Sequence, residues 1–186
     1  MSYEALVFDF FGVICTDVAP LWFAERFPES EREALKEQYV HPADIGVESQ
    51  EELLTELAGL SGDTPAEIIT NWQRRAKLDT ELLAFIKELR KSRKIGLLSN
   101  APSPFFRSLL ERGGVADLFD AIVVSSEVGH AKPEPEIFHV ILERLGVAPE
   151  KALMIDDNAA NVDGAIAVGM GGYLFTSVQA LKDKLA

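Results

Sequence analysis

The sequence predicts an α/β fold, a doubly wound parallel sheet with an inserted α-helical cap. Short apolar runs that stop at a polar residue recur along the chain, as expected for buried strands of a parallel sheet. After residue 78 these runs alternate with helical patterns, whereas residues 16–78 contain helical patterns only. We therefore expect a core domain made of residues 1–15 and 79–186, and a helical cap domain at residues 16–78.

The core elements follow in chain order. The expected strands are the apolar runs at residues 5–8, 94–99, 121–124, 152–155 and 172–176. A helix with one apolar face precedes the second run. Another begins at Ser103 and ends at the glycine pair after Arg112, because a serine before proline favours a helix start and glycine favours a stop. A third helix closes at Gly146.

The expected cap carries helix-start signals and no convincing strand. Ser49 and Thr64 each begin a capping box, in which a glutamate follows three residues later. Proline directly after Thr64 suits the first position of a helix. The stretch from Leu21 to Tyr39 supplies at least one further helix.

The composition is that of an acidic globular protein, with 186 residues, 47% hydrophobic residues and a formal net charge of −12. Such a charge argues against a nucleic-acid partner, because phosphate backbones select basic surfaces. Cys15 is the single cysteine, which excludes an intrachain disulfide and fits a reducing compartment. The first residues lack a signal-peptide pattern, and no apolar stretch reaches the roughly 18 residues of a membrane span. We expect a cytoplasmic protein that binds neither nucleic acid nor membrane; monomer and homodimer are equally compatible with the sequence.

Acidic residues follow two of the expected strands. Asp9 comes directly after the first run, and the doublet Asp156 and Asp157 comes directly after the fourth. Ligands bind beyond the carboxyl ends of strands in open α/β sheets, so these side chains would meet at one edge and could hold a hard cation such as Mg²⁺. The structural alternative is that Asp9 starts a turn and Asp157 with Asn158 caps the next helix.

Two further polar residues are expected at the same edge. Ser99 ends the run at 94–99, and Lys132 follows the run at 121–124. A hydroxyl and an ammonium there would complement a phosphate whose other oxygens a metal covers. Considered alone, Ser99 would be an ordinary polar loop residue and Lys132 an ordinary solvent-exposed lysine. Their common position after strands favours a phosphate site.

These positions lie in motifs that together resemble the haloacid dehalogenase-like hydrolase superfamily. The motifs are VFDFFGVI at 7–14, LLSN at 97–100, KPEPEIF at 132–138 and MIDDN at 154–158. The resemblance covers essentially the whole chain. It implies a Rossmann-like core with a small helical cap that covers the active site and excludes water. It also implies a hydrolase, foremost an Mg²⁺-dependent phosphatase of a small phosphorylated metabolite.

The resemblance implies a role for each acidic residue that matches a motif. Asp9 would be the nucleophile and form an aspartyl-phosphate, which splits one hard displacement into two easier ones. Mg²⁺ would be held by Asp9, by Asp156 and by the backbone carbonyl of Phe11. Asp157 would be a supporting ligand, bound directly or through water.

The resemblance also implies roles for the other polar residues. Ser99 would hydrogen-bond a phosphoryl oxygen. Lys132 would pair with both Asp9 and the phosphate. Asn100 and the start of the helix at Ser103 would add backbone donors.

Phe11 departs from the family pattern. Phosphatases of the family usually place a second aspartate two positions after the nucleophile, where it protonates the leaving group and later activates water. A phenyl ring does neither. General acid–base catalysis is worth roughly 10²- to 10⁴-fold, so transfer to a poor leaving group should be slow. His130 and Asp17 are the nearest candidates for a replacement acid.

The sequence is compatible with three functions. The first is a metal-dependent phosphatase that is slow or that borrows an acid from elsewhere. The second is a metal-independent 2-haloacid dehalogenase, for which Phe11 would be harmless because halide needs no proton. Against it, Asp156 and Asp157 would repel an anionic substrate, and the cap offers only Arg26 for the substrate carboxylate. The third is a non-catalytic phosphate-binding or interaction module that kept the metal site.

Overall fold

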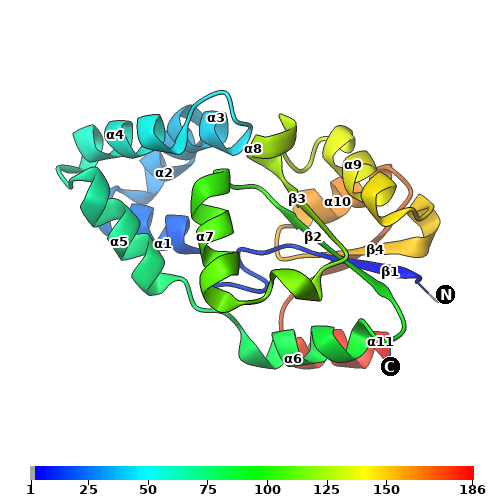
Figure 1. The fold of residues 1–186 in the computed structure, drawn as a ribbon. Helices are drawn as coiled ribbons and strands as arrows, with labels where there is room; N and C mark the ends of the chain where they lie inside the picture. The colour runs from blue at the N-terminus through cyan, green and yellow to red at the C-terminus, as the bar shows by residue number, and fades with distance from the viewer. Residues whose placement is uncertain (1–2) are drawn as a thin grey trace.

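A computed structural model describes residues 3–186 and shows a five-stranded sheet flanked by helices (Figure 1). All four strand pairs are parallel, and the spatial order is β3-β2-β1-β4-β5. The strands are β1 (Ala5–Phe8), β2 (Lys94–Ser99), β3 (Ala121–Val124), β4 (Ala152–Asp156) and β5 (Gly171–Leu174). The predicted fold class is confirmed.

Helices cover both faces of the sheet. The core helices are α6 (Thr80–Leu89), α7 (Ser103–Gly113), α8 (Ser125–Val128), α9 (Pro135–Leu145), α10 (Ala159–Ala167) and α11 (Val178–Leu185), with 3₁₀ turns η2 (Ala116–Leu118) and η3 (Pro149–Lys151). Leu6 and Phe8 of β1 share a hydrophobic cluster with residues of α6, α7 and α11. Ala5 and Val7 share the other cluster with residues of α9 and α10. The central strand is therefore buried on both sides, as its unbroken apolar sequence predicts.

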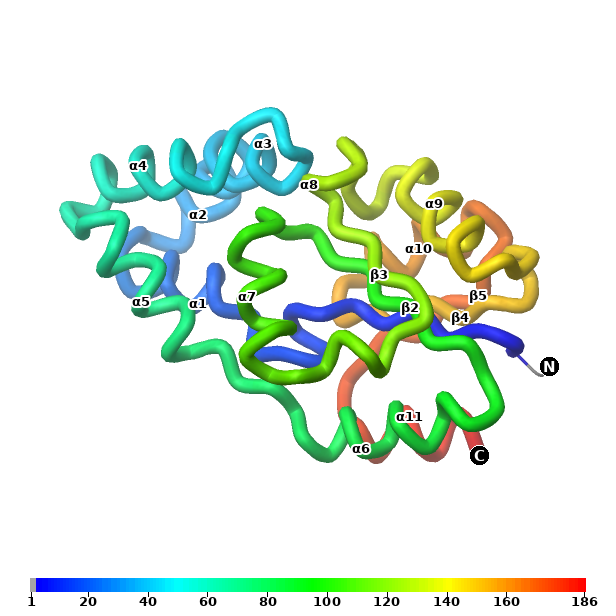
Figure 2. The backbone as a smooth tube through the Cα atoms, viewed as in Figure 1, coloured from blue at the N-terminus to red at the C-terminus, as the bar shows by residue number. Residues whose placement is uncertain are grey.

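Between β1 and α6 the described chain forms helices and no further strand of the sheet, apart from isolated β-bridges of Cys15 to Phe11 and Leu78. They are α1 (Val18–Arg26), α2 (Glu29–Leu35), a π-helical turn η1 (Lys36–Val40), α3 (His41–Asp44), α4 (Gln50–Ser61) and α5 (Pro65–Arg75). Both predicted capping boxes form, with Ser49 at the start of α4 and Thr64 at the start of α5. In Figure 2 this blue-to-cyan group lies to one side of the sheet, with α7 next to it. We call it the cap; a domain boundary at residues 16–78 stays a prediction.

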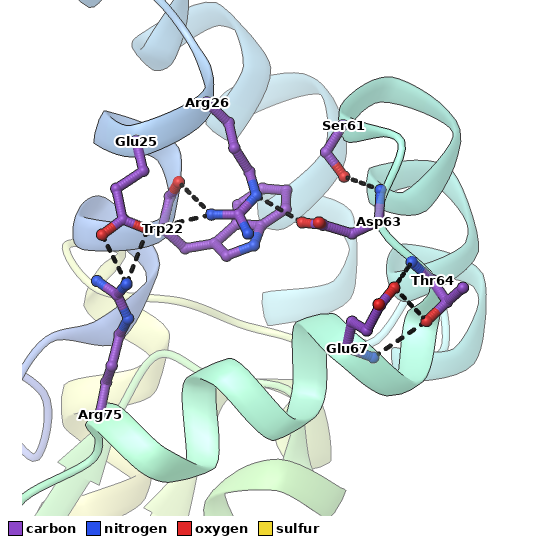
Figure 3. Close-up of polar contacts among 8 residues, drawn as sticks. All are labelled: Trp22, Glu25, Arg26, Ser61, Asp63, Thr64, Glu67 and Arg75. Atoms are coloured by element: carbon purple, nitrogen blue, oxygen red, sulfur yellow. Dashed lines mark hydrogen bonds and ion pairs between the residues drawn. The ribbon is translucent and has the colours of Figure 1, made fainter.

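Charged residues join the helices of the cap (Figure 3). The guanidinium of Arg26 lies 4.6 Å from the centre of the Trp22 ring, and its Nε donates a hydrogen bond to Asp63 at 2.5 Å. Arg75 of α5 donates to Glu25 of α1 at 2.6 Å. These contacts hold α1 against α5 and against the turn that precedes α5.

The cap also touches the core near α3. Gly46 follows this short helix with a positive φ of 73°, and a Cβ at this position would overlap the backbone carbonyl of Ser126 in α8. The Ser126 hydroxyl in turn donates to the carbonyl of Ala101 at 2.8 Å. Glycine therefore permits a close approach between cap and core at this point.

Candidate active site

Asp9 and Asp156 lie at the same edge of the sheet, as predicted. β1 and β4 are neighbours with Phe8 opposite Ile155, so the residues that follow these partners are adjacent. The Asp9 amide donates to the Ile155 carbonyl at 2.9 Å. Both carboxylates are buried, with Asp9 7% exposed and Asp156 fully buried.

Lys132 bridges the two carboxylates. Its Nζ lies 2.7 Å from Oδ1 of Asp9 and 2.7 Å from Oδ2 of Asp156. Burial alone would lower the pKa of Lys132, but the two carboxylates outweigh it and raise that pKa. Burial raises the pKa of Asp9 to about 7, with Asp156 adding to the increase and Lys132 opposing it. Two acids and one base leave this buried cluster with a surplus of negative charge, which favours a bound cation.

Hydrogen bonds fix the orientation of Asp156. Asn161 Nδ2 donates to both of its carboxylate oxygens at 3.1 Å, and the Asn158 amide donates to Oδ1 at 2.9 Å. The Asn158 side chain also caps α10 by accepting from the Ala160 amide. Asn158 therefore caps the next helix, as the structural alternative predicts. The Asp156 carboxylate instead lies in the site, bound to Lys132.

Asn100 holds the loop that carries Lys132. Its side-chain Nδ2 donates to the Lys132 carbonyl at 2.9 Å, and its Oδ1 accepts from the Lys132 amide at 2.9 Å. The side chain of Asn100 thus positions Lys132 directly. Its predicted role as a donor to substrate stays a prediction.

Ser99 is fully buried at the end of β2, and its hydroxyl has no hydrogen-bond partner among the described residues. An unpaired buried hydroxyl is costly, about 1–3 kcal/mol, so such groups call for an explanation. A bound phosphoryl oxygen would supply the missing partner. The observation agrees with the predicted role of Ser99.

Asp9, Asp156 and Asp157 can present carboxylate oxygens within 4.8 Å of one another. Gly12 makes room for Asp157: its φ is +88°, and any Cβ there would collide with the Asp157 carboxylate. Burial and the charge of Asp156 raise the pKa of Asp157. A set of oxygen ligands around a negative cluster suits Mg²⁺. The predicted contribution of the Phe11 carbonyl stays a prediction.

The carboxylates open onto a cavity of about 270 Å³ between the sheet edge and the cap. Aromatic rings form one wall. Phe11 stacks on Phe105 with ring centres 6.0 Å apart and planes 1° from parallel, and Trp72 of α5 lies 5.6 Å from Phe105. The Phe11 side chain is therefore part of an apolar wall, and it leaves the position of the family's acid without a proton donor.

Two cap carboxyls face the same cavity. Asp17 precedes α1 and makes no cap hydrogen bond, and Asp44 ends α3. Burial raises the pKa of Asp17 to about 6, with Asp157 adding and Lys36 opposing. Burial raises the pKa of Asp44 to about 7, with Asp17 adding to the increase. Asp44 was not predicted, since no motif or periodicity distinguishes it from a surface acid.

His130, suggested as a replacement acid, and Arg26, suggested as the partner of a substrate carboxylate, do not line the cavity. His130 is half-exposed, and its Nδ1 lies 3.2 Å from Glu134. Arg26 is bound to Asp63 and Trp22 within the cap (Figure 3). Among the described residues that line the cavity there is no arginine, so the carboxylate-binding group that a haloacid dehalogenase needs has no counterpart there.

The chain belongs to the haloacid dehalogenase-like hydrolase family, whose model matches residues 3–169. The predicted family is thereby confirmed, and with it the prediction of a hydrolase related to phosphatases. A phosphorylated carbohydrates phosphatase from Thermotoga maritima is 29% identical, over 97% of this chain and 88% of its own. A phosphoserine phosphatase from Thermus thermophilus is 33% identical, over 82% of this chain and 67% of its own.

Solved structures show the same fold. A family enzyme from Bacteroides thetaiotaomicron matches all of both chains with a TM-score of 0.85 at 21% identity. In another structure, that enzyme is in complex with magnesium and inorganic phosphate; the match has a TM-score of 0.79 at 22% identity and covers 97% of this chain and 99% of the other. No helix among the described residues is both long and apolar enough to span a membrane.

Proposed function

We propose that this protein is an Mg²⁺-dependent phosphatase of a small phosphorylated metabolite, acting through an aspartyl-phosphate on Asp9. The observation that carries the proposal is the buried bridge of Lys132 to Asp9 and Asp156, each at 2.7 Å, with Asp157 beside it. This arrangement combines a nucleophile, a cation for the phosphate and a set of oxygen ligands for a metal. The phosphatases among the relatives support the same reaction class.

In the first step an Asp9 oxygen attacks phosphorus and the bond to the leaving oxygen breaks. Lys132 holds Asp9 in place and pairs with the phosphoryl oxygens, while the Ser99 hydroxyl donates a hydrogen bond to one of them. Asp9, Asp156, Asp157 and the Phe11 carbonyl would hold Mg²⁺, which would neutralise charge on the transferring group. In the second step water attacks phosphorus and Asp9 is released.

The cavity limits the substrate to a small molecule. About 270 Å³ leaves space for a phosphate and a compact organic group. The stacked rings of Phe11 and Phe105, with Trp72 tilted against Phe105, offer an apolar surface to that group. The two named relatives act on phosphorylated carbohydrates and phosphoserine, which are small phosphate esters.

Hydrolysis of an aryl phosphate, with and without Mg²⁺, tests the reaction. We expect turnover that requires Mg²⁺ and that Asp9→Asn abolishes, because the amide is not a nucleophile. Asp120→Asn is the control, since Asp120 lies at the surface and accepts from Arg90 and from the Ile95 amide at the end of β2 opposite to Ser99. Turnover that survives in Asp9→Asn would contradict the proposed nucleophile.

Metal binding is tested separately by thermal shift. Mg²⁺ should stabilise the wild type, and Asp156→Ala should remove this response because it deletes a ligand. An unchanged response in Asp156→Ala would place the metal elsewhere.

The apolar wall at Phe11 favours one alternative, a phosphate-binding or interaction module without turnover. That function predicts Mg²⁺ binding in a protein that remains inert toward every phosphate ester. Release of chloride from 2-chloropropionate in the presence of a chelator would instead identify a dehalogenase.

A further inference from the structure

The sheet edge supplies a carboxylate nucleophile, a lysine and candidate metal ligands, but no acid for a basic leaving group. Asp9 and Lys132 line the cavity from the sheet edge and the cap lines it from the other side, so the leaving oxygen of an ester attacked by Asp9 would depart toward the cap. Attack and departure occur on opposite sides of phosphorus in an in-line displacement. The missing acid must therefore come from the cap side of the cavity.

Two cap carboxyls line the cavity, and their neighbours distinguish them. The charges of Asp157 and Lys36 act on Asp17, so its neighbours include a predicted metal ligand. Asp44 lies within reach of Lys132, the residue that bridges to the nucleophile. Among the described residues no hydrogen bond or ion pair occupies the Asp44 carboxyl, which leaves it available to a substrate.

The backbone around Asp44 is well placed to hold this carboxyl over the site. Asp44 is the last residue of α3, and Gly46, two residues later, packs directly against the Ser126 carbonyl in the core. This contact ties the end of α3 to the segment after β3, which leads on to Lys132. The cap thus presents Asp44 from a fixed point beside the phosphate site.

We propose that Asp44 is the general acid and base of this enzyme, in place of the carboxyl that Phe11 lacks; the inference rests on the proposed phosphatase function. As the Asp9 oxygen attacks phosphorus, the electron pair of the breaking P–O bond goes to the leaving oxygen, which takes the proton of Asp44. The alcohol then leaves. Asp44, now a carboxylate, takes a proton from the water that attacks the aspartyl-phosphate. The Asp9–phosphorus bond breaks, and phosphate departs with Asp9 and Asp44 restored.

The ionisation of Asp44 agrees with this role. Burial keeps its pKa near 7, so a large fraction of the carboxyl is protonated around neutral pH. A general acid works best when its pKa lies near the working pH. The charges that face it are Asp17 and Lys132, which act in opposite directions.

Leaving-group dependence tests the assignment. An aryl phosphate such as p-nitrophenyl phosphate needs no proton on its leaving oxygen, whereas glycerol phosphate does. With Mg²⁺, Asp44→Asn should lower kcat on glycerol phosphate by about 10²- to 10⁴-fold and kcat on the aryl ester by less than about fivefold. Asp44→Glu should recover part of the loss. Asp17→Asn is the matched control and should change both substrates by the same factor.

Each result has a distinct meaning. Equal losses on both substrates in Asp44→Asn would overturn the assignment while leaving the phosphatase intact. A selective loss in Asp17→Asn would overturn it in favour of Asp17. Wild-type protein that binds Mg²⁺ but cleaves neither ester would overturn the proposed function itself, and this inference with it. Thermal unfolding of each variant distinguishes a catalytic loss from a folding defect.

Discussion

At the scale of single residues, Lys132 is the buried side chain that links the two carboxylates of the site. Removing a cation from a buried cluster leaves Asp9 and Asp156 facing each other, and breaking such a pair costs about 3–5 kcal/mol. We expect Lys132→Met to lose about 3 kcal/mol of unfolding free energy in a chelator and to recover part of it with Mg²⁺. Urea denaturation measures both values.

Lys151 provides the matched control for that experiment. Its ammonium lies 3.3 Å from Glu4, but both side chains are about half-exposed or more. Exposed pairs contribute about 0–1 kcal/mol, so Lys151→Met should be nearly neutral and insensitive to Mg²⁺. A Lys132→Met variant as stable as Lys151→Met would mean that the bridge contributes nothing to stability.

Asp44 should make stability depend on pH. Its pKa is about 7 in the folded protein, against an ordinary value of 3.8, so the folded state binds more protons between these pH values and stability falls as pH rises through that range. Asp44→Asn should match the wild type near pH 4 and exceed it at pH 8 by about 2 kcal/mol, less than the full shift because water enters the cavity. Unfolding at both pH values measures the difference.

Asp63→Asn should behave in the opposite way. Arg26 holds the pKa of Asp63 below its usual value. The contribution of the ionised Asp63 to stability is therefore present above the pKa of the unfolded state and is lost as pH falls. The asparagine variant should therefore be less stable than the wild type at pH 8. If both variants shifted stability in the same direction, the Asp44 carboxyl would not carry the expected charge penalty.

At the scale of elements, the contact between α3 and α8 depends on Gly46. An alanine there adds a collision with the Ser126 carbonyl to the cost of a positive φ. Gly62 also has a positive φ, of 79°, but no atom lies within 4 Å of its Cβ position. Both substitutions should cost ~1–2 kcal/mol for the backbone, and Gly46→Ala should cost ~1–2 kcal/mol more.

Gly46→Ala and Gly62→Ala also test whether the contact between the cap and the core affects KM. Gly46→Ala should raise KM for a phosphate ester, since displacement of α3 opens the cavity. Gly62→Ala, at the remote end of α4, should leave KM unchanged. Unfolding free energies and KM values that are equal in the two variants would show that the contact at Ser126 does not position the cap.

The elements that sequence patterns predict well are those determined by local chemistry. The capping boxes at Ser49 and Thr64 form because donor and acceptor lie within one helical turn. Asp9 and Asp156 were predictable because Asp9 directly follows β1 and Asp156 ends β4, and parallel strands align their carboxyl ends. Asp44 was not predictable as a site residue, because only the packing of the cap over the sheet brings it to the cavity. The pairing of Asn100 with Lys132 likewise depends on two loops meeting in space.

At the scale of the whole molecule, the carboxylates around the cavity outnumber its lysines in a chain of net charge −12. An anionic phosphate would be repelled from such a site in the absence of a metal. Under the proposed function, the acidic surroundings would make magnesium a condition for phosphate binding as well as for reaction. Inorganic phosphate should bind measurably only when Mg²⁺ is present.

Both tryptophans of the chain, Trp22 and Trp72, belong to the cap, and only Trp72 lines the cavity. The tryptophan fluorescence of this protein, excited selectively over that of its tyrosines, consequently originates in the cap alone. Phosphate added with Mg²⁺ should change the emission of the wild type and of Trp22→Phe, but not that of Trp72→Phe. An unaltered emission in wild type under conditions where calorimetry shows binding would mean that the ligand stays away from the aromatic wall. The cap thus carries its own optical reporter of events in the cavity beneath it.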